Sequence, residues 1–358
     1  MTGRRRLRRR DFLAAAGTVG ITGATGCLGF LETKSVRREP PLPDDRPDAV
    51  YFPSHVEGMQ MVGTQASGRY RCALSYTFPH RFWLVRDTAV DRVKVRGADD
   101  VHLMVSVWDA ELGVVLPAAS PQVEYTGPEG ETESFAPWQM LSQQMGVHNG
   151  DNVTLGPEGT YDVSVRVAPP STRRSERGDV STEPVTFDFQ LTYDRSALES
   201  LSYRDVPSDR EGTEGAVDPM GMDAVSVSRV PAADDLSMPV RGSAQTGGAE
   251  LVAVVADQAG SLATGDDETY LALSLRTPYN RFVLPSASAF AAVGAGGETV
   301  FDGALTPTLD ADLGYHYGAV VPTGDPLDEL TVGVDTPPQV SRHEGYETAF
   351  FDFDPVTF

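Results

Sequence analysis

The chain has 358 residues, and acidic side chains outnumber basic ones so far that the formal net charge is -22. Only two lysines occur, Lys34 and Lys94. This composition excludes a nucleic-acid-binding protein, which needs a basic face, and disfavours anionic substrates. It is typical of a halophilic protein that works in very high salt, where counter-ions screen the repulsion between like charges.

The N-terminal residues 1–27 predict an export signal that is not part of the fold. Arg9-Arg10-Asp11-Phe12-Leu13 has the form of a twin-arginine signal, and the apolar run over residues 13–25 is too short to span a membrane. Ala24-Thr25-Gly26-Cys27 resembles a lipobox, so we interpret Cys27 as the residue that carries a lipid. A lipoprotein of this kind is extracytoplasmic and anchored to the outer face of the cell membrane. In the alternative, Cys27 is only a small residue of a discarded leader.

A Pro-rich tether follows over residues 28–48, where extended and solvated chain would hold a domain away from the membrane. If Cys27 is lipidated, Cys72 is the remaining thiol, so no disulfide can form within the chain. Cys72 lies among alternating apolar residues, which predicts a buried packing role rather than reactivity.

The rest of the chain contains a duplication at a constant offset. Three segments reappear 168 residues further on: 102–107 as 270–275, 115–120 as 283–288, and 146–150 as 314–318. A repeat of this length indicates a duplicated domain rather than a solenoid of short units.

Within each copy, short alternating runs are separated by Gly, Pro, Asp and Asn, which is the pattern of a β-sandwich. The sequence therefore predicts an all-β chain with two sandwiches in tandem, at residues 49–197 and 233–358. An acidic linker over residues 198–232 is expected to join them. Each copy has an ordinary single-domain size.

The strand around His102 carries the first candidate metal ligands. Because side chains alternate along a strand, Val101 and Leu103 are expected to face the core, while His102 and Met104 share the opposite face. Thioether sulfur suits Cu(I), and imidazole suits copper or iron, so this pair forms half of a soft metal site. The alternative is a surface His beside a Met that packs under a loop.

A second group of candidate ligands lies in residues 140–150, which hold Met140, Met145 and His148. Two glycines in this segment would let the chain turn, so that His148 projects from a loop. The alternative is a Met-lined edge of the core with a His in a turn.

Further Met and His residues occur early in the first copy. Met59 and Met61 form another pair on one face, whereas His55 and His80 are expected to be surface or turn residues. No Ser-His-Asp arrangement, phosphate loop or Cys-based zinc pattern is visible, so hydrolase and nucleotide-binding functions have no support.

The sequence motifs that allow a family comparison are Asp100-Val101-His102-Leu103, Gly146-Val147-His148-Asn149-Gly150-Asp151-Asn152-Val153, Gly159-Thr160-Tyr161 and Gly314-Tyr315-His316-Tyr317-Gly318-Ala319-Val320. They resemble the periplasmic iron-transport family, the metal-binding partners of ferrous-iron permeases in bacterial pathogens, to which a treponemal membrane antigen also belongs. The resemblance covers most of residues 55–192 and, more loosely, 240–355. It implies an immunoglobulin-like sandwich, often dimeric, in which several His and a Met bind a copper or iron ion. A metal permease is the partner that it implies.

Carried over residue by residue, the resemblance implies that His102 and His148 are two of the family's His ligands. Met140 is the best match to its Met ligand, although the spacing differs by one residue. Met104 stands where the family has an acidic ligand. The first copy therefore offers a softer set of donor atoms than the family pattern.

Neither copy has the complete set of ligands that the resemblance implies. A further family His is absent from the first copy, where Ser175 takes its position, but the second copy has His343 there, together with His316. Conversely, the second copy has Tyr270 in place of the first His and Leu309 near the Met position.

Because family members pair as dimers, one hypothesis is that the two copies pair within one chain as an intrachain pseudo-dimer. In this hypothesis, His343 approaches His102 and completes the site of the first copy. The function that the sequence favours is a membrane-anchored metal-binding protein for iron or copper capture or transport, without chemistry on a substrate. The alternative is a cell-surface lipoprotein scaffold of duplicated sandwiches that has lost metal binding.

Overall fold

The computed structural model describes residues 40–176, 183–221, 225–226, 228–257, 260–262, 265–323 and 326–358. The predicted export signal, Cys27 and most of the predicted tether lie outside these residues. Residues 39–358 form one compact unit. Within the described part of the chain, no helix is both long enough and apolar enough to cross a membrane.

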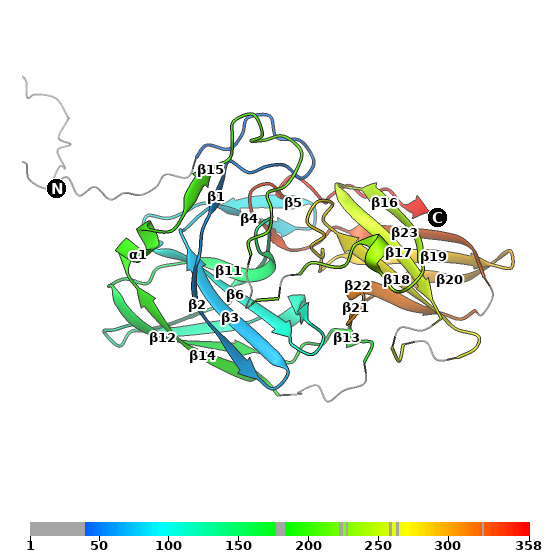
Figure 1. Ribbon diagram of the computed structural model, residues 1–358, viewed down its shortest axis with the longest axis horizontal. Coiled ribbons are helices and arrows are strands. Elements are labelled where there is room, and N and C mark those ends of the chain that lie inside the picture. The colour runs from blue at the N-terminus through cyan, green and yellow to red at the C-terminus, as the bar shows by residue number, and fades with distance from the viewer. Residues whose placement is uncertain are drawn as a thin grey trace, which may run out of the picture. The chain divides into compact units, whose positions relative to one another are not determined.

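Strands make up nearly all of the regular structure, so the predicted all-β class is confirmed (Figure 1). In the first copy the strands are β1 His55–Glu57, β2 Gln60–Ser67, β3 Tyr70–Thr77, β4 Phe82–Arg86, β5 Ala89–Val93, β6 Val101–Asp109, β7 Val114–Val115, β8 Gln122–Thr126, β9 Thr132–Phe135, β10 Trp138–Ser142, β11 Gly146–Val153, β12 Gly159–Val167, β13 Arg173–Arg174 and β14 Val185–Tyr193, and β15 Tyr203–Asp205 follows in the expected linker. In the second they are β16 Val240–Thr246, β17 Ala249–Ala256, β18 Thr269–Arg276, β19 Ser288–Ala295, β20 Glu298–Ala304, β21 Thr306–Asp310, β22 Gly314–Val321, β23 Leu327–Thr336, β24 Ser341–Arg342 and β25 Val356–Thr357. The helical segments are α1 Arg195–Glu199 and the short 3-10 turns η1 Pro117–Ala119 and η2 Ala233–Asp235.

Each copy contains a larger and a smaller sheet. In the first copy the larger sheet has the strand order β2-β3-β6-β11-β10-β24-β4-β5, with β7 on β6, and the smaller has the order β14-β12-β8-β9. In the second copy the orders are β13-β21-β22-β18-β17-β16 and β20-β19-β23-β25. Alternate residues of the facing strands, such as Leu103 and Val105 of β6 and Tyr161 and Val163 of β12, are buried in a shared hydrophobic core. This sandwich arrangement follows from the period-two apolar pattern of the strands.

Two short strands are exchanged between the copies. β13 pairs in parallel with β21, where Arg173 lies opposite Thr308, and β24 pairs in parallel with β10, where Ser341 lies opposite Met140. β13 and β24 occupy equivalent places in the duplication, because Arg173 and Ser341 are 168 residues apart. Each copy therefore contributes a strand to the larger sheet of the other copy.

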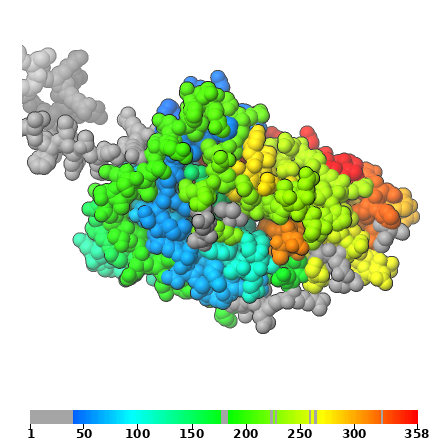
Figure 2. Space-filling model, viewed as in Figure 1, coloured from blue at the N-terminus to red at the C-terminus, as the bar shows by residue number. Residues whose placement is uncertain are grey.

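The segment expected to be an acidic linker packs against the first copy. β15 pairs with β1, so the adjoining green and blue surfaces at the top of Figure 2 belong to segments far apart in the sequence. Further on, the backbone N–H groups of Val217 and Met220 donate to Gln143 and Gln144 at 2.8 and 2.9 Å. These hydrogen bonds hold the segment beside the turn between β10 and β11.

Strand β6 differs from its predicted environment, because both of its faces are buried. The side of Leu103 faces the core as expected, but His102 on the other side is also fully buried. Rings of His80, Phe82 and His343 cover it. His102 therefore lies on the face opposite Leu103, as predicted, but it is not exposed, because the connection before β4 and the segment after β24 close over this face of the sheet.

Candidate metal centre

Three neighbouring strands, β6, β11 and β10, form the floor of the candidate site. Cross-strand pairs on this part of the sheet are Asn152 with His102, Gly150 with Met104, and His148 with Met140. A Cβ atom placed on Gly150 would lie 2.7 Å from Nε2 of His102 and 3.3 Å from Sδ of Met140. The missing side chain of Gly150 therefore leaves a depression in the sheet, and imidazole and thioether groups meet there.

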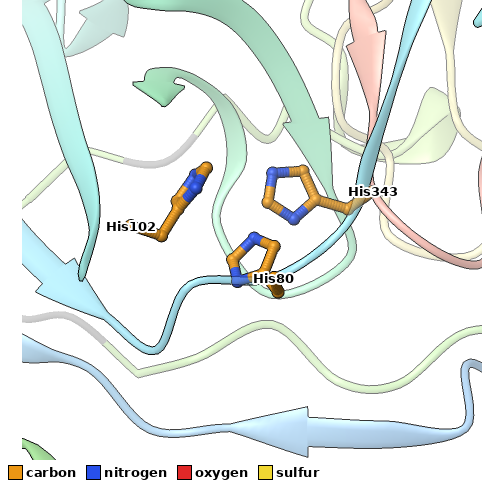
Figure 3. A group of neighbouring side chains, drawn as sticks. All are labelled: His80, His102 and His343. Carbon is orange, nitrogen blue, oxygen red and sulfur yellow. The ribbon is translucent and has the colours of Figure 1, made fainter. Parts of the chain in front are cut away.

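His80, before β4, and His343, directly after β24, cover this depression. One ring nitrogen from each of His80, His102 and His343 lies within 4.8 Å of those of the other two, and Figure 3 shows the three rings turned toward a common space. The ring of His148 lies 5.2 Å from that of His343, centroid to centroid, and Nε2 of His343 lies 3.3 Å from Sδ of Met140. We refer to these four His and Met140 as the histidine cluster. Nitrogens on opposite sides of one metal ion are about 4 Å apart, since metal–nitrogen bonds are about 2 Å long, so small ring movements would bring the set into coordination range.

In three of the four imidazoles, Nδ1 carries the proton, because each Nδ1 faces an oxygen that can only accept. The acceptors are Asn152 Oδ1 for His102 at 2.9 Å, Gly146 O for His148 at 3.1 Å and Phe78 O for His80 at 3.0 Å. A neutral imidazole protonated at Nδ1 has its lone pair on Nε2. Metal-binding His residues are commonly oriented by such an oxygen acceptor.

The three Nε2 atoms of His80, His102 and His148 are buried and have no hydrogen-bond partner in the described structure. A buried polar atom without a partner costs about 1–3 kcal/mol, so most such atoms in proteins are satisfied. Three unpartnered lone pairs near one another are therefore a sign that something else binds them.

Burial also keeps the imidazoles of His102, His148 and His343 neutral at physiological pH. It lowers the pKa of His148 to about 4 and those of His102 and His343 well below their usual range, and the neighbouring His80 lowers all three further. Only a neutral imidazole can donate a lone pair to a metal ion. His102, His148 and His343 are therefore in their ligand form near pH 7.

Charged groups beside the cluster hold His80 and His343 in place. Burial alone would raise the pKa of Glu57, but hydrogen bonds from His55 and His80 outweigh it and lower the pKa to about 2. The resulting carboxylate lies 3.3 Å from Nδ1 of His80. Arg81 and Glu344, which directly follow the two His residues, form an ion pair with each other. Both covering segments are thus fixed by partners outside the cluster.

Four of the seven residues proposed from the sequence as metal ligands meet in the histidine cluster: His102, Met140, His148 and His343. Rings of His102 and His343 lie 5.6 Å apart, centroid to centroid, which places His343 where the pseudo-dimer hypothesis requires it. Met104 and Met145 line a pocket that His80 and His343 also border. His148 does not project from a loop as expected, because residues 146–153 continue as strand β11.

The structure does not bring His316 to the cluster, and the equivalent place in the second copy is closed. His316 repeats the bond of His148 by donating Nδ1–H to Gly314 O at 3.1 Å, but its Nε2 accepts from the Tyr270 hydroxyl at 2.8 Å. Arg173, from the exchanged strand β13, donates to Gly318 O and to the Tyr270 hydroxyl. The imidazole of His316 therefore has no lone pair free for a metal ion.

The sequence interpretation missed His80, which was expected at the surface or in a turn. Its side chain is only 12% exposed, and its ring lies 4.1 Å from that of His102, centroid to centroid. The amide of Asn152 causes this by bonding both backbone groups of His80: Nδ2 donates to its carbonyl at 2.9 Å and Oδ1 accepts from its N–H at 3.3 Å. The one available signal was the aromatic run around His80, which is unusual for an exposed turn.

Comparisons with known proteins are sparse. A family described as a domain of unknown function (DUF7350) matches residues 234–358. No curated protein matches the chain. Among solved structures, the copper-reconstituted P19 protein from Campylobacter jejuni is similar at 17% identity and a TM-score of 0.30, over 38% of this chain and 96% of that one. FetP of uropathogenic Escherichia coli strain F11 is similar at 18% identity and a TM-score of 0.30, over 39% of this chain and 95% of that one. At these scores, the candidate centre rests on the geometry of this chain alone.

Proposed function

We propose that the protein captures a single copper or iron ion at the histidine cluster and carries or presents it outside the cytoplasm. The observation that supports this most directly is the set of three buried, unpartnered Nε2 atoms of His80, His102 and His148. Their protons are held on the far side of each ring, so three lone pairs face the space beside His343 and Met140. One metal ion would satisfy all of them together.

The donor atoms narrow the choice of metal ion. Imidazole nitrogen and thioether sulfur suit copper and iron, whereas Mg²⁺ and Ca²⁺ prefer oxygen ligands. The carboxylate nearest the cluster belongs to Glu57 and is already bonded to His55 and His80. Two of the ligands, His102 and His148, lie on a rigid sheet, and His343 is supplied by the exchanged segment of the second copy.

The role we propose is metal capture without chemistry on a substrate. The pocket beside the cluster has a cavity volume of about 90 Å³, well below the size of pockets that hold organic ligands. The twin-arginine motif and Cys27 support export and lipid anchoring, and a metal permease is the partner that the sequence resemblance implies. The alternative of a scaffold that has lost metal binding leaves the three unpartnered nitrogens without an explanation.

The decisive experiment is titration of the full chain with Cu(II) and, without oxygen, with Fe(II). We expect one ion bound per chain, and we expect His102→Gln and His343→Gln each to weaken binding at least about 100-fold, because each removes a direct ligand. The matched control is His316→Gln, which changes a buried His at the equivalent place of the closed second copy and should leave binding unchanged. Unaltered binding of both metals in the first two variants, with the fold intact by circular dichroism, would remove the proposed function.

A further inference from the structure

Methionine is concentrated beside the histidine cluster. Of the nine Met residues in the chain, seven lie in the described part, and five of these are at the cluster or in the adjoining pocket. Met140 belongs to the cluster itself, and the pocket is lined by Met59, Met104, Met145 and Met220. We call these four residues with His80 and His343, which border the same space, the methionine pocket.

The methionine pocket joins the cluster to the outside of the protein. Met104 and Met145 are buried next to the sheet, whereas Met59 and Met220 are only partly buried. His80 and His343 border the pocket and also belong to the cluster. Thioether sulfur atoms are therefore available at more than one depth between solvent and the imidazole ligands.

The second copy shows that packing alone does not require Met at these places. At the offset of 168 residues, Met104, Met140 and Met145 correspond to Ala272, Thr308 and Leu313. These three residues are as deeply buried as their Met counterparts. All three sulfur atoms are thus missing in the copy whose imidazole is closed by Tyr270, and all three are present in the copy whose imidazoles are open.

The chemistry of thioether sulfur favours one class of ion. Sulfur in Met is a soft, uncharged ligand and a weak hydrogen-bond acceptor, so it suits Cu(I) and does little for hard divalent ions or water. The pocket contains the carboxylate of Glu57, but His55 and His80 occupy its oxygens.

We propose that the methionine pocket is the route by which Cu(I) enters, and that it selects this ion over divalent metals before the histidines bind it. The ion passes from Met59 and Met220 to Met104 and Met145, and then to His80 and His343, without any change of oxidation state. This inference rests on the proposed function of the histidine cluster, because the pocket borders that site through His80 and His343.

The test compares the full chain with the triple variant Met59→Leu, Met145→Leu, Met220→Leu. Leu preserves most of the side-chain volume, and the second copy already has Leu at the place equivalent to Met145. Cu(I) is supplied as a complex with a coloured chelator, so that its transfer to the protein is followed as the colour changes. Cu(II) is titrated in parallel. We expect Cu(I) transfer to slow by about tenfold or more, while the affinity for Cu(II) stays unchanged because the imidazoles are intact.

Controls separate this inference from the function on which it rests. Met61→Leu with Met238→Leu, outside the pocket, should leave transfer of both ions unchanged, and unfolding curves check that the triple variant folds. If that variant is unstable, Met59→Leu with Met220→Leu is used, because both side chains are only partly buried. Unchanged Cu(I) transfer, or an equal loss for Cu(I) and Cu(II), would overturn the route if His102→Gln still weakens binding. Unchanged binding in both His102→Gln and His343→Gln would instead overturn the metal centre itself.

Discussion

Single residues decide how each copy uses the same imidazole. His148 and His316 each donate Nδ1–H to a glycine carbonyl two residues earlier, and both hydrogen bonds are 3.1 Å long. In the first copy the nearby residue on the adjacent strand β6 is His102, and the Nε2 atoms of His102 and His148 have no partner in the described structure. In the second it is Tyr270, whose hydroxyl donates to His316. The exchange of His for Tyr on this strand therefore gives the second copy's imidazole a hydrogen-bond partner that the first copy's imidazole lacks.

The closed copy yields a prediction about acid stability. Burial lowers the pKa of His316 to about 4, against an unfolded value of about 6.5. As the pH falls below 6.5, the unfolded chain binds a proton at this His before the folded protein does. The contribution of His316 to the free energy of unfolding is therefore fully present above pH 6.5 and is lost progressively down to about pH 4. The difference corresponds to about 3 kcal/mol.

Urea unfolding of the metal-free chain and of His316→Gln between pH 7 and pH 4 measures this effect. Over this pH range, the free energy of unfolding should fall by about 3 kcal/mol less in the variant than in the wild type, because Gln does not titrate. Other buried His residues contribute equally to both proteins and cancel in the comparison. Parallel pH profiles for the two proteins would contradict the prediction.

At the level of elements, the exchanged strand β24 is what places His343. The backbone N–H of His343 donates to Leu141 O at 3.0 Å, and the buried guanidinium of Arg342 donates to the carbonyls of Ala349 and Pro338 at 2.6 and 2.8 Å. These bonds fix the segment on both sides of the imidazole. Periodicity could not reveal this, because a strand of two residues has no alternating pattern. The constant offset could suggest it, since it aligned His343 with Ser175.

A glycine in strand β11 gives the prediction at this scale. Gly150→Ala would place a methyl group 2.7 Å from Nε2 of His102 and 3.3 Å from Sδ of Met140, which is too close for an ordinary contact. The methyl group would fill the depression toward which the ligands point. We therefore expect copper affinity to fall at least about tenfold, which is the usual effect of disturbing the geometry of metal ligands in proteins.

Isothermal titration of Gly150→Ala with Cu(II) tests this expectation. Gly63→Ala in strand β2 is the matched control, because its methyl group would have only Phe189 nearby, at 3.9 Å. The control should bind copper like the wild type. Equal affinity in both variants would show that the ligands do not meet above Gly150.

At the scale of the whole molecule, local sequence patterns account for what could be predicted, and contacts between residues far apart in the sequence account for what could not. Alternating strands such as β12 and β14 gave the all-β class, and motifs around His102 and His148 gave two members of the cluster. His80 escaped because its position depends on Asn152, which is 72 residues away and carries no local pattern. The closure of the second copy escaped because Tyr270 had to be paired with His316 across two strands.

The charge of the whole chain leads to the last prediction. With 51 acidic against 29 basic side chains, the folded state confines a large excess of negative charge, and salt screens that repulsion. The unfolded chain spreads the same charge over a larger volume, so added KCl should stabilise the folded state more. A gain of about 2 kcal/mol would raise the unfolding midpoint by about 3 °C at this chain length. Calorimetry from 0.1 to about 2 M KCl measures the change, and near pH 4.6, where the net charge approaches zero, the dependence on salt should largely disappear. A midpoint that ignores KCl at neutral pH, or that rises equally at both pH values, would show that the charge excess does not control the stability.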